Sequence, residues 1–166
     1  MAVQRLRKDE GTRLREVRLR ALRDAPYAFS SWLEREAEYS PDMWEDRAAQ
    51  SDAGEAGAVF VAIENGRCLG MAGSYFGDED RDVAILWGMW VDPRARRRGL
   101  GRELVNAVVA WARDCGARRL ELSVTDSEPS RPAAALYRGL GFVETGKQEQ
   151  LASDSSLVAV AMSRSL

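Results

Sequence analysis

Histidine is absent from the 166 residues of this chain, and cysteine occurs only twice. Without histidine the chain cannot build Ser-His-Asp or Cys-His catalytic pairs, and the usual zinc ligand sets are missing too, so we expect no metal. Cys68 and Cys115 lie in different predicted elements, which favours two reduced thiols over a disulfide. Any general acid or base must therefore be a carboxylate, a tyrosine, a thiol, a lysine or water.

Long apolar runs and an excess of one charge are also missing. No segment approaches the length needed to cross a bilayer, and residues 1–5 do not begin a secretory signal, so we expect a cytoplasmic chain without a membrane partner. The net charge of −2 gives no overall attraction to nucleic acid, although a local basic patch stays open. The length fits one domain over residues 1–166.

The N-terminal third is predicted to be a strand over residues 3–7 followed by helices. Thr12 is a plausible N-cap for the first helix, Ser31 and Glu34 have capping-box spacing for a second, and the Ser-Pro pair at 40–41 suits the start of a third. The first helix has an apolar stripe at helical spacing, formed by Leu14, Val17, Ala21 and Leu22.

An Asn-Gly pair at 65–66 separates two apolar runs, 59–63 and 68–72, and predicts a hairpin because both turn residues must take positive φ. Further elements are predicted in this order: a strand at 82–91, a helix at 99–115 capped by Gly116, a strand at 120–124, a short helix at 132–138, and strands at 142–146 and 157–162. The order β-α-α-β-β-β-α-β-α-β-β predicts an α/β fold with a mixed, mostly antiparallel sheet flanked by helices.

The segment from Val91 to Gly101 runs from a strand through a basic glycine turn into a helix, which is a geometry that binds anions. Glycines let the backbone approach a phosphate closely, and the arginines of the turn can add charge-assisted contacts. The dinucleotide fingerprint fails because Leu104 stands where a small residue is needed, and the Gly-Lys-Ser/Thr of a P-loop is absent.

The blocks at 96–101 and 133–142 resemble two motifs of the GNAT superfamily of N-acyltransferases. Arg96-Arg97-Arg98-Gly99-Leu100-Gly101 is similar to its Arg/Gln-x-x-Gly-x-Gly/Ala pyrophosphate loop, and the segment 133–142 is similar to its Ala-x-x-Leu-Tyr-x-x-x-Gly-Phe block. Each block alone is short, but together, in this order and on these elements, they are specific. The resemblance implies an acetyl-CoA-dependent transferase that acts on a primary amine.

The resemblance also implies where the cofactor lies. Backbone groups of the central strand pair with the pantetheine arm, the glycine turn holds the pyrophosphate, and Ser130 falls where the family often has asparagine. The cofactor-binding residues implied in this way are Met89, Trp90, Val91, Arg96, Arg97, Arg98, Gly99, Leu100, Gly101, Arg102 and Ser130.

Tyr137 matches the tyrosine that commonly protonates the departing thiolate in the family, and a phenol is still protonated at neutral pH. The glutamate that several members carry on the central strand is missing. The base is then a water relay or a carboxylate of the N-terminal helices, where Glu34, Glu36, Glu38 and Asp42 are available, most of them as ordinary surface charges.

Two rival functions stay open: a non-catalytic acyl-CoA-binding or regulatory module, and, much less favoured, a nucleic-acid-binding protein that uses the arginines at 94–102. The amine acceptor is not identified. Its selection is assigned to the N-terminal helices and to the loops at 76–81 and 151–156. A homodimer is left open.

Overall fold

The computed structural model describes residues 1–77 and 80–166, and in these ranges seven strands form one sheet in the order β1-β2-β3-β4-β5-β7-β6. Among the described strands, only the β4–β5 pair is parallel. The predicted fold, a mixed and mostly antiparallel α/β sheet, is confirmed. The strands are β1 Ala2–Arg5, β2 Gly57–Glu64, β3 Arg67–Phe76, β4 Val83–Val91, β5 Arg119–Thr125, β6 Val143–Leu151 and β7 Asp154–Ser165.

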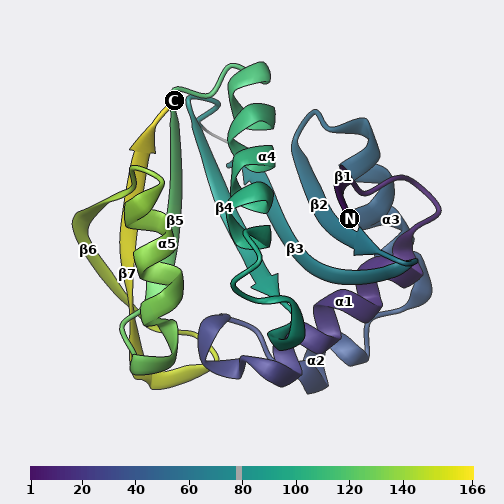
Figure 1. Cartoon of the computed structure of the whole chain (residues 1–166), viewed down its shortest axis with the longest axis horizontal. Helices are drawn as coiled ribbons and strands as arrows, with labels where there is room; N and C mark the ends of the chain where they lie inside the picture. Colours follow the sequence, from purple (N-terminus) through teal and green to yellow (C-terminus); the bar gives the residue numbers. More distant parts are fainter. Residues whose placement is uncertain (78–79) are drawn as a thin grey trace.

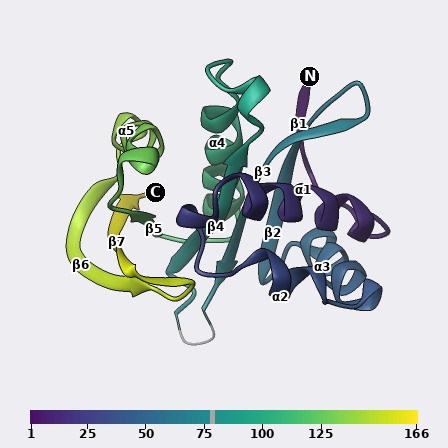
Figure 2. The ribbon, with the colours of Figure 1, turned by 90° about the horizontal axis from the view of Figure 1, so that it is seen from below.

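Helices cover both faces of the sheet. Figure 2 shows α4 and α5 on one face, with α1, α2 and α3 on the other. Each face has its own apolar core. Leu104 and Val108 of α4 are fully buried in one core, and Leu14 of α1 and Trp44 of α3 are fully buried in the other. The helices are α1 Gly11–Asp24, α2 Leu33–Ala37, α3 Pro41–Ala53, α4 Leu100–Asp114 and α5 Arg131–Gly139. Three helices therefore lie between β1 and β2, in agreement with the three predicted helix starts, where the predicted element order had two.

One of the three predicted helix starts is confirmed. Ser40 caps α3, its Oγ accepting from the Met43 N–H at 3.3 Å. Thr12 is not a cap, because α1 already begins at Gly11 after Glu10. The capping box at Ser31 is also wrong, since α2 begins at Leu33 after an extended Trp32 and has no side-chain cap.

The Asn-Gly hairpin is confirmed, with φ of 51° at Asn65 and 75° at Gly66. The C-terminal hairpin is longer than predicted, since β6 and β7 continue to a tight turn at 152–153 where a loop over 151–156 was expected. The reason is that β6 is exposed along almost its whole length and therefore lacks an alternating apolar pattern. The predicted loop 76–81 includes residues 78 and 79, which lie outside the described residues.

The sheet is split between β4 and β5. Val83, Ala84 and Ile85 pair with 119–121, and beyond this point the two strands diverge toward the carboxyl end of β4 (Figure 1). The edge of β4 that faces β5 is therefore free of strand partners from Leu86 onward. Such an open edge inside a sheet offers unpaired backbone groups to a ligand.

Candidate active site

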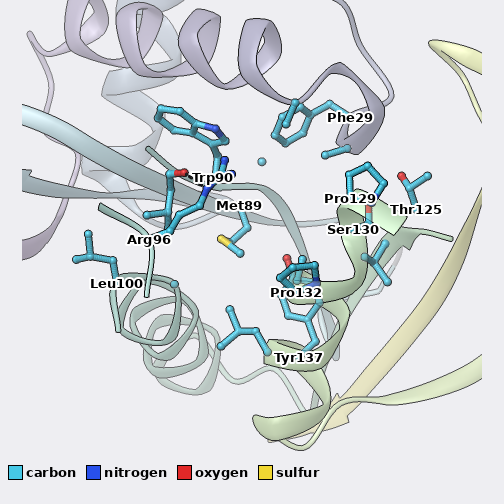
Figure 3. Close-up of a pocket in the computed structure, with 18 of the residues that line it drawn as sticks. Phe29, Met89, Trp90, Arg96, Leu100, Thr125, Pro129, Ser130, Pro132 and Tyr137 are labelled. Atoms are coloured by element: carbon cyan, nitrogen blue, oxygen red, sulfur yellow. Dashed lines mark hydrogen bonds between the residues drawn. The ribbon is translucent and has the colours of Figure 1, made fainter. Parts of the chain in front are cut away.

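The gap between β4 and β5 holds a cavity of about 600 Å³. Its walls come from β4, the start of α4, the start of α5, the end of β5 and the 3₁₀ turn Pro26–Ala28 after α1. Figure 3 shows Met89 near the middle of this space, with Phe29 and Trp90 on the α1 side and Thr125 and Ser130 near β5. The cavity brings together the two motif blocks of the sequence, 96–101 and 133–142, which α4 and β5 separate in the chain.

A bulge at Gly88 shapes the open edge of β4. The strand pairs Trp87 with Gly73 and Trp90 with Met71, so two residues of β4 face one residue of β3. Gly88 has a φ of 64°, which is in the left-handed region that glycine adopts without cost. The bulge shifts by one residue the alternation of side chains between the two faces of the sheet. Leu86, before the bulge, and Met89, after it, therefore both pack in the core beneath α4.

The backbone of β4 beyond the bulge alternates between the two neighbouring strands. The Asp92 N–H donates to the Leu69 carbonyl of β3 at 2.8 Å. Because successive residues of a strand point their backbone groups in opposite directions, those of Met89 and Val91 face the gap. These are two of the three strand residues that the sequence motif indicated, and Trp90 lies between them with its backbone toward β3.

The start of α4 presents free donors to the cavity. Its first hydrogen bond runs from Glu103 N to Gly99 O at 3.1 Å, so the N–H groups of Leu100, Gly101 and Arg102 have no partner within the helix. A Cβ on Gly101 would lie 3.0 Å from Leu136 and 3.8 Å from Met89, which shows that this glycine keeps the cavity open between α4, α5 and β4. The helix dipole adds positive potential at the same place.

The three arginines of the turn point in different directions. Arg97 lines the cavity. Its φ of 62° turns the backbone at this residue, so its side chain points in a different direction from the side chains of Arg96 and Arg98. Arg98 does not line the cavity and instead pairs with Glu64 of β2 at 2.6 Å, an interaction that lowers the pKa of the Glu64 carboxyl. Arg102 on α4 also lines the cavity. The cations placed at the site are therefore Arg96, Arg97 and Arg102.

Arg96 lines the cavity but is already engaged. Its Nε donates to the Val91 carbonyl at 3.0 Å, and its Nη2 donates to Asp24 at 2.6 Å. The same Asp24 oxygen accepts from the Trp90 indole at 2.9 Å. Asp24 thus fixes Trp90 and Arg96 from the end of α1 and connects the N-terminal helix to the anion-binding turn.

Tyr137 of α5 lies on the cavity wall and is only 5% exposed. Burial raises the pKa of its phenol well above the usual value, so the hydroxyl stays protonated. Its ring packs edge-on against Phe142 at a centroid distance of 5.8 Å. Ser130, at the start of α5, is buried in the same wall, where its Oγ accepts from Ser127 at 3.0 Å.

The opposite wall, toward α1, was not identified from the sequence. Tyr27 and Phe29 line the cavity here, and their carbonyls accept hydrogen bonds from Thr125 at 2.8 Å and from Ser153 at 2.5 Å. These bonds fasten the segment after α1 to β5 and to the β6–β7 turn. The composition of residues 26–29 gave no motif, and the only signal was Pro26 ending the helix.

No Asp or Glu belongs to the described residues that line this cavity. Glu34, Glu38 and Asp42 are exposed on the N-terminal helices. Glu36, the fourth of the carboxylates considered as the base, is 4% exposed and receives two hydrogen bonds from Arg18. Burial opposes its ionisation, but the hydrogen bonds and charge of Arg18 outweigh this and lower the pKa of Glu36. Both oxygens of Glu36 thus accept from Arg18, and Glu36 does not line the cavity between β4 and β5.

Both cysteines are free, and burial raises the pKa of the Cys68 thiol to about 11. Among the described residues there is no cluster of three or more potential metal ligands. No helix within the described ranges is long and apolar enough to span a membrane.

The cavity fits an elongated ligand with a diphosphate at one end. The free N–H groups of α4 and the side chains of Arg97 and Arg102 suit the diphosphate, and the open edge of β4 suits an amide-containing arm. Tyr137, with its protonated hydroxyl, lies on the wall of the same cavity. These are the features that acetyl-coenzyme A requires.

Comparison with known proteins agrees with this geometry. Residues 18–142 match the model of the acetyltransferase (GNAT) family. The chain is 36% identical over 107 residues to aminoglycoside N(6')-acetyltransferase type 1 of Stenotrophomonas maltophilia, which covers 60% of this chain and 69% of the relative. It is 33% identical over 121 residues to the ribosomal protein bS18-alanine N-acetyltransferase of Escherichia coli K12, covering 73% and 76% of the two chains.

The fold has solved counterparts as well. The PaiA N-acetyltransferase of Thermoplasma acidophilum, in complex with coenzyme A, superimposes with a TM-score of 0.78 at 14% identity, and the match covers 100% of both chains. The family model spans the anion-binding turn, the open strand edge and Tyr137. The chain therefore belongs to the GNAT family of acetyltransferases, and it is an acyltransferase that uses acetyl-CoA as its co-substrate.

Proposed function

We propose that this chain is an N-acetyltransferase that moves the acetyl group of acetyl-CoA to a primary amine of a small molecule or a protein. The observation that carries the proposal is that one cavity brings together three separate elements: the free N–H groups of α4, the open edge of β4 and the buried hydroxyl of Tyr137. Acetyl-CoA supplies the activated acyl group, and the chain supplies binding, orientation and a proton.

In this proposal the diphosphate lies on the N–H groups of Leu100, Gly101 and Arg102. Gly99 lets the turn approach the diphosphate, while Arg97 and Arg102 add charge. Arg98, which pairs with Glu64, acts only at long range. Arg96 holds the Val91 carbonyl, so Val91 offers its N–H to the ligand.

The pantetheine arm then runs along β4, where the backbone groups of Met89 and Val91 face the gap. One such N–H directed at the thioester oxygen stabilises the charge that develops there, by about 3 kcal/mol for a well-placed donor. The indole of Trp90 is held on the α1 side by Asp24 and packs in the core. Ser130 closes the other wall at the start of α5.

Tyr137 is proposed as the general acid. When the amine has attacked, the thiolate of coenzyme A leaves and takes the phenolic proton. Burial raises the pKa of the phenol, so the phenol is protonated at neutral pH, as a proton donor must be. The acceptor's own proton leaves through water, because the described cavity wall carries no carboxylate.

The missing carboxylate also favours the rival function, a non-catalytic module that binds acyl-CoA. A panel of amines with acetyl-CoA distinguishes the two: we expect amine-dependent release of free coenzyme A and an acetylated product by mass spectrometry. The names of the two curated relatives indicate aminoglycosides and N-terminal alanine peptides as acceptors to include. A raised melting temperature with acetyl-CoA but no acetylated product from any amine would favour the rival.

Three further expectations belong to this proposal. Residues 1–166 act as a single N-acetyltransferase domain, since one sheet runs through the described parts of the chain. The chain works in the cytoplasm, in keeping with its two free thiols. Neither nucleic acid nor membrane is a partner, and a homodimer is left to measurement of the molecular mass in solution.

A further inference from the structure

A second cavity lies on the α1 side of the sheet, next to the first. It has a volume of about 470 Å³ and is bounded by α1, α2, α3 and strands β2 to β4. Trp87 of β4 lines both cavities, and it stands beside the Gly88 bulge at the proposed reaction centre. Trp87 is therefore a wall that the two cavities share.

The charged side chains that line the second cavity are Arg18, Glu36 and Arg47. Both oxygens of Glu36 are occupied, since Oε2 accepts from Arg18 Nε at 3.0 Å and Oε1 from Arg18 Nη2 at 2.9 Å. The only lining carboxylate is thus neutralised, and a surplus of one positive charge remains on the described lining.

Arg18 keeps one donor unused. The side chain is 6% exposed, and its Nη1 has no hydrogen-bond partner in the part of the chain that the structure describes. The guanidinium lies 4.9 Å from the centre of the Phe29 ring and 5.5 Å from that of Trp87, and Nη1 is 3.5 Å from the point where a Cβ of Gly88 would lie. The unused donor therefore stands in the wall between the two cavities.

Arg47 of α3 is half-buried at the second cavity and is reachable from solvent. Its guanidinium lies over the rings of Tyr39 and Trp44, 5.0 and 5.3 Å from their centres. Within the described ranges it makes no ion pair or side-chain hydrogen bond. An arginine fixed by two aromatic faces, with its donors free, is arranged to bind a carboxylate.

Most of the remaining described lining is apolar or already satisfied, and Gln50 adds an exposed amide. Ser51 bonds backbone groups of Leu6 and Val59, and Ser74 donates to the Ile85 carbonyl. Tyr75 and Trp87 contribute aromatic surface. A ligand with an apolar body and one anionic end fits this lining, whereas a polycation meets two arginines and, among the described lining residues, no free carboxylate.

We propose that the acceptor is an amine that carries a carboxylate at its far end, with the carboxylate held in the second cavity by Arg47 and by the free donor of Arg18. This inference rests on the proposed acetyl transfer and names the class of its acceptor. The amine nitrogen lies on the first-cavity side of Trp87, the apolar body packs on Tyr75 and Trp87, and the carboxylate replaces the water around Arg47.

The test compares acceptors matched in chain length: ω-amino carboxylates, n-alkylamines and α,ω-diamines, with an aminoglycoside as a polycationic probe. We expect kcat/KM to be highest for one of the amino carboxylates. Arg47→Gln should reduce the ratio of kcat/KM between the amino carboxylate and the alkylamine by about ten- to a hundredfold, the range expected for one hydrogen bond to a charged group. Arg164→Gln, a half-buried arginine of β7 that lines neither cavity, is the control and should leave the ratio unchanged.

A binding measurement separates this inference from catalysis. Calorimetric titration of an n-alkyl carboxylate into the protein saturated with coenzyme A should give a dissociation constant that rises in Arg47→Gln and not in Arg164→Gln. Preference for diamines or the aminoglycoside, or a specificity ratio that Arg47→Gln does not change, would overturn the inference while leaving acetyl transfer intact. Failure of every amine to release coenzyme A would instead remove the proposed function and this inference with it.

Discussion

Gly101 offers the sharpest single perturbation of the cofactor site. A Cβ at this position points into the cavity, 3.0 Å from Leu136 and 3.9 Å from Val91, so a glutamate side chain must enter the space assigned to the diphosphate. It brings a negative charge to a helix N-terminus that is otherwise free to bind an anion. Loss of one charge-assisted hydrogen bond and the added repulsion amount to roughly 3 kcal/mol, or about a hundredfold in the dissociation constant of acetyl-CoA.

The same substitution should not weaken the fold. Replacing glycine in the first turn of α4 favours the helix by about 0.5–1 kcal/mol, and a carboxylate near the helix N-terminus adds about 0.3–1 kcal/mol. Displacement of the Leu136 side chain offsets part of this gain. We therefore expect the melting temperature of the ligand-free Gly101→Glu variant to stay within about 2–4 °C of the parent, the shift that 1 kcal/mol produces at this size.

Isothermal titration with acetyl-CoA measures the first effect and calorimetric unfolding the second. Ala110→Glu serves as the control, because it adds the same charge to the exposed side of the same helix. The control should bind like the parent. Unchanged affinity in Gly101→Glu would refute the placement of the diphosphate, and a large fall in melting temperature would refute the reasoning about the helix.

Four further predictions follow from the same geometry. Tyr137→Phe should lower kcat by about 10²–10⁴-fold with little change in the KM for acetyl-CoA, because the hydroxyl acts only as the thiolate leaves; near-normal kcat in a reaction limited by chemistry would contradict this. Since Tyr137 stays protonated and the described cavity wall holds no carboxylate, kcat/KM for the acceptor should rise about tenfold per pH unit toward the acceptor's own pKa; a plateau well below that pKa would reveal a base on the enzyme. Arg97→Ala should weaken acetyl-CoA binding about tenfold in a calorimetric titration, and Arg98→Ala should weaken it less; the reverse order would contradict the assignment. Removing the Glu36 carboxylate alone should lower the free energy of unfolding by about 3–5 kcal/mol, because Arg18 is then buried without a partner, whereas the double variant Arg18→Met/Glu36→Leu should lower it much less. Because the pKa of Glu36 is lowered in the fold, the stability that its carboxylate contributes should be lost as pH falls below about 4.5. Equal losses in the single and double variants would show that the pair is not the cause.

The sequence predicted the elements whose signals are local. Asn65-Gly66 specified a hairpin because both residues must take positive φ, and Ser40 before Pro41 specified the start of α3. The glycine turn after Val91 likewise stands at the start of a helix, as its residues indicated. In these cases the residues that decide the structure are neighbours in the chain.

Features that depend on distant contacts were missed or misplaced. Three consecutive arginines look equivalent in the sequence, but the positive φ of Arg97 and the partner Glu64 send Arg98 away from the cavity. Nothing next to Glu36 in the sequence set it apart from the other three carboxylates, because its partner, Arg18, comes from another helix. A signal was present nonetheless, since Arg18 falls four residues after Leu14 on the apolar stripe of α1, where an arginine needs a buried partner.

The bulge at Gly88 was also not predicted, although it directs the open edge of β4. An isolated glycine in a strand is compatible with either a regular strand or a bulge, and only the pairing of Trp87 and Trp90 with β3 decides between them. The wall formed by Tyr27 and Phe29 has no motif because hydrogen bonds from Thr125 and Ser153 hold it in place.

A crystal structure of the protein with coenzyme A tests the central claim most directly. The account predicts density for the diphosphate at the N–H groups of Leu100 and Gly101, and for the pantetheine arm along Met89 and Val91, with the sulfur within reach of the Tyr137 hydroxyl. Density for coenzyme A in the second cavity, or on the outer surface at Arg98, would contradict it.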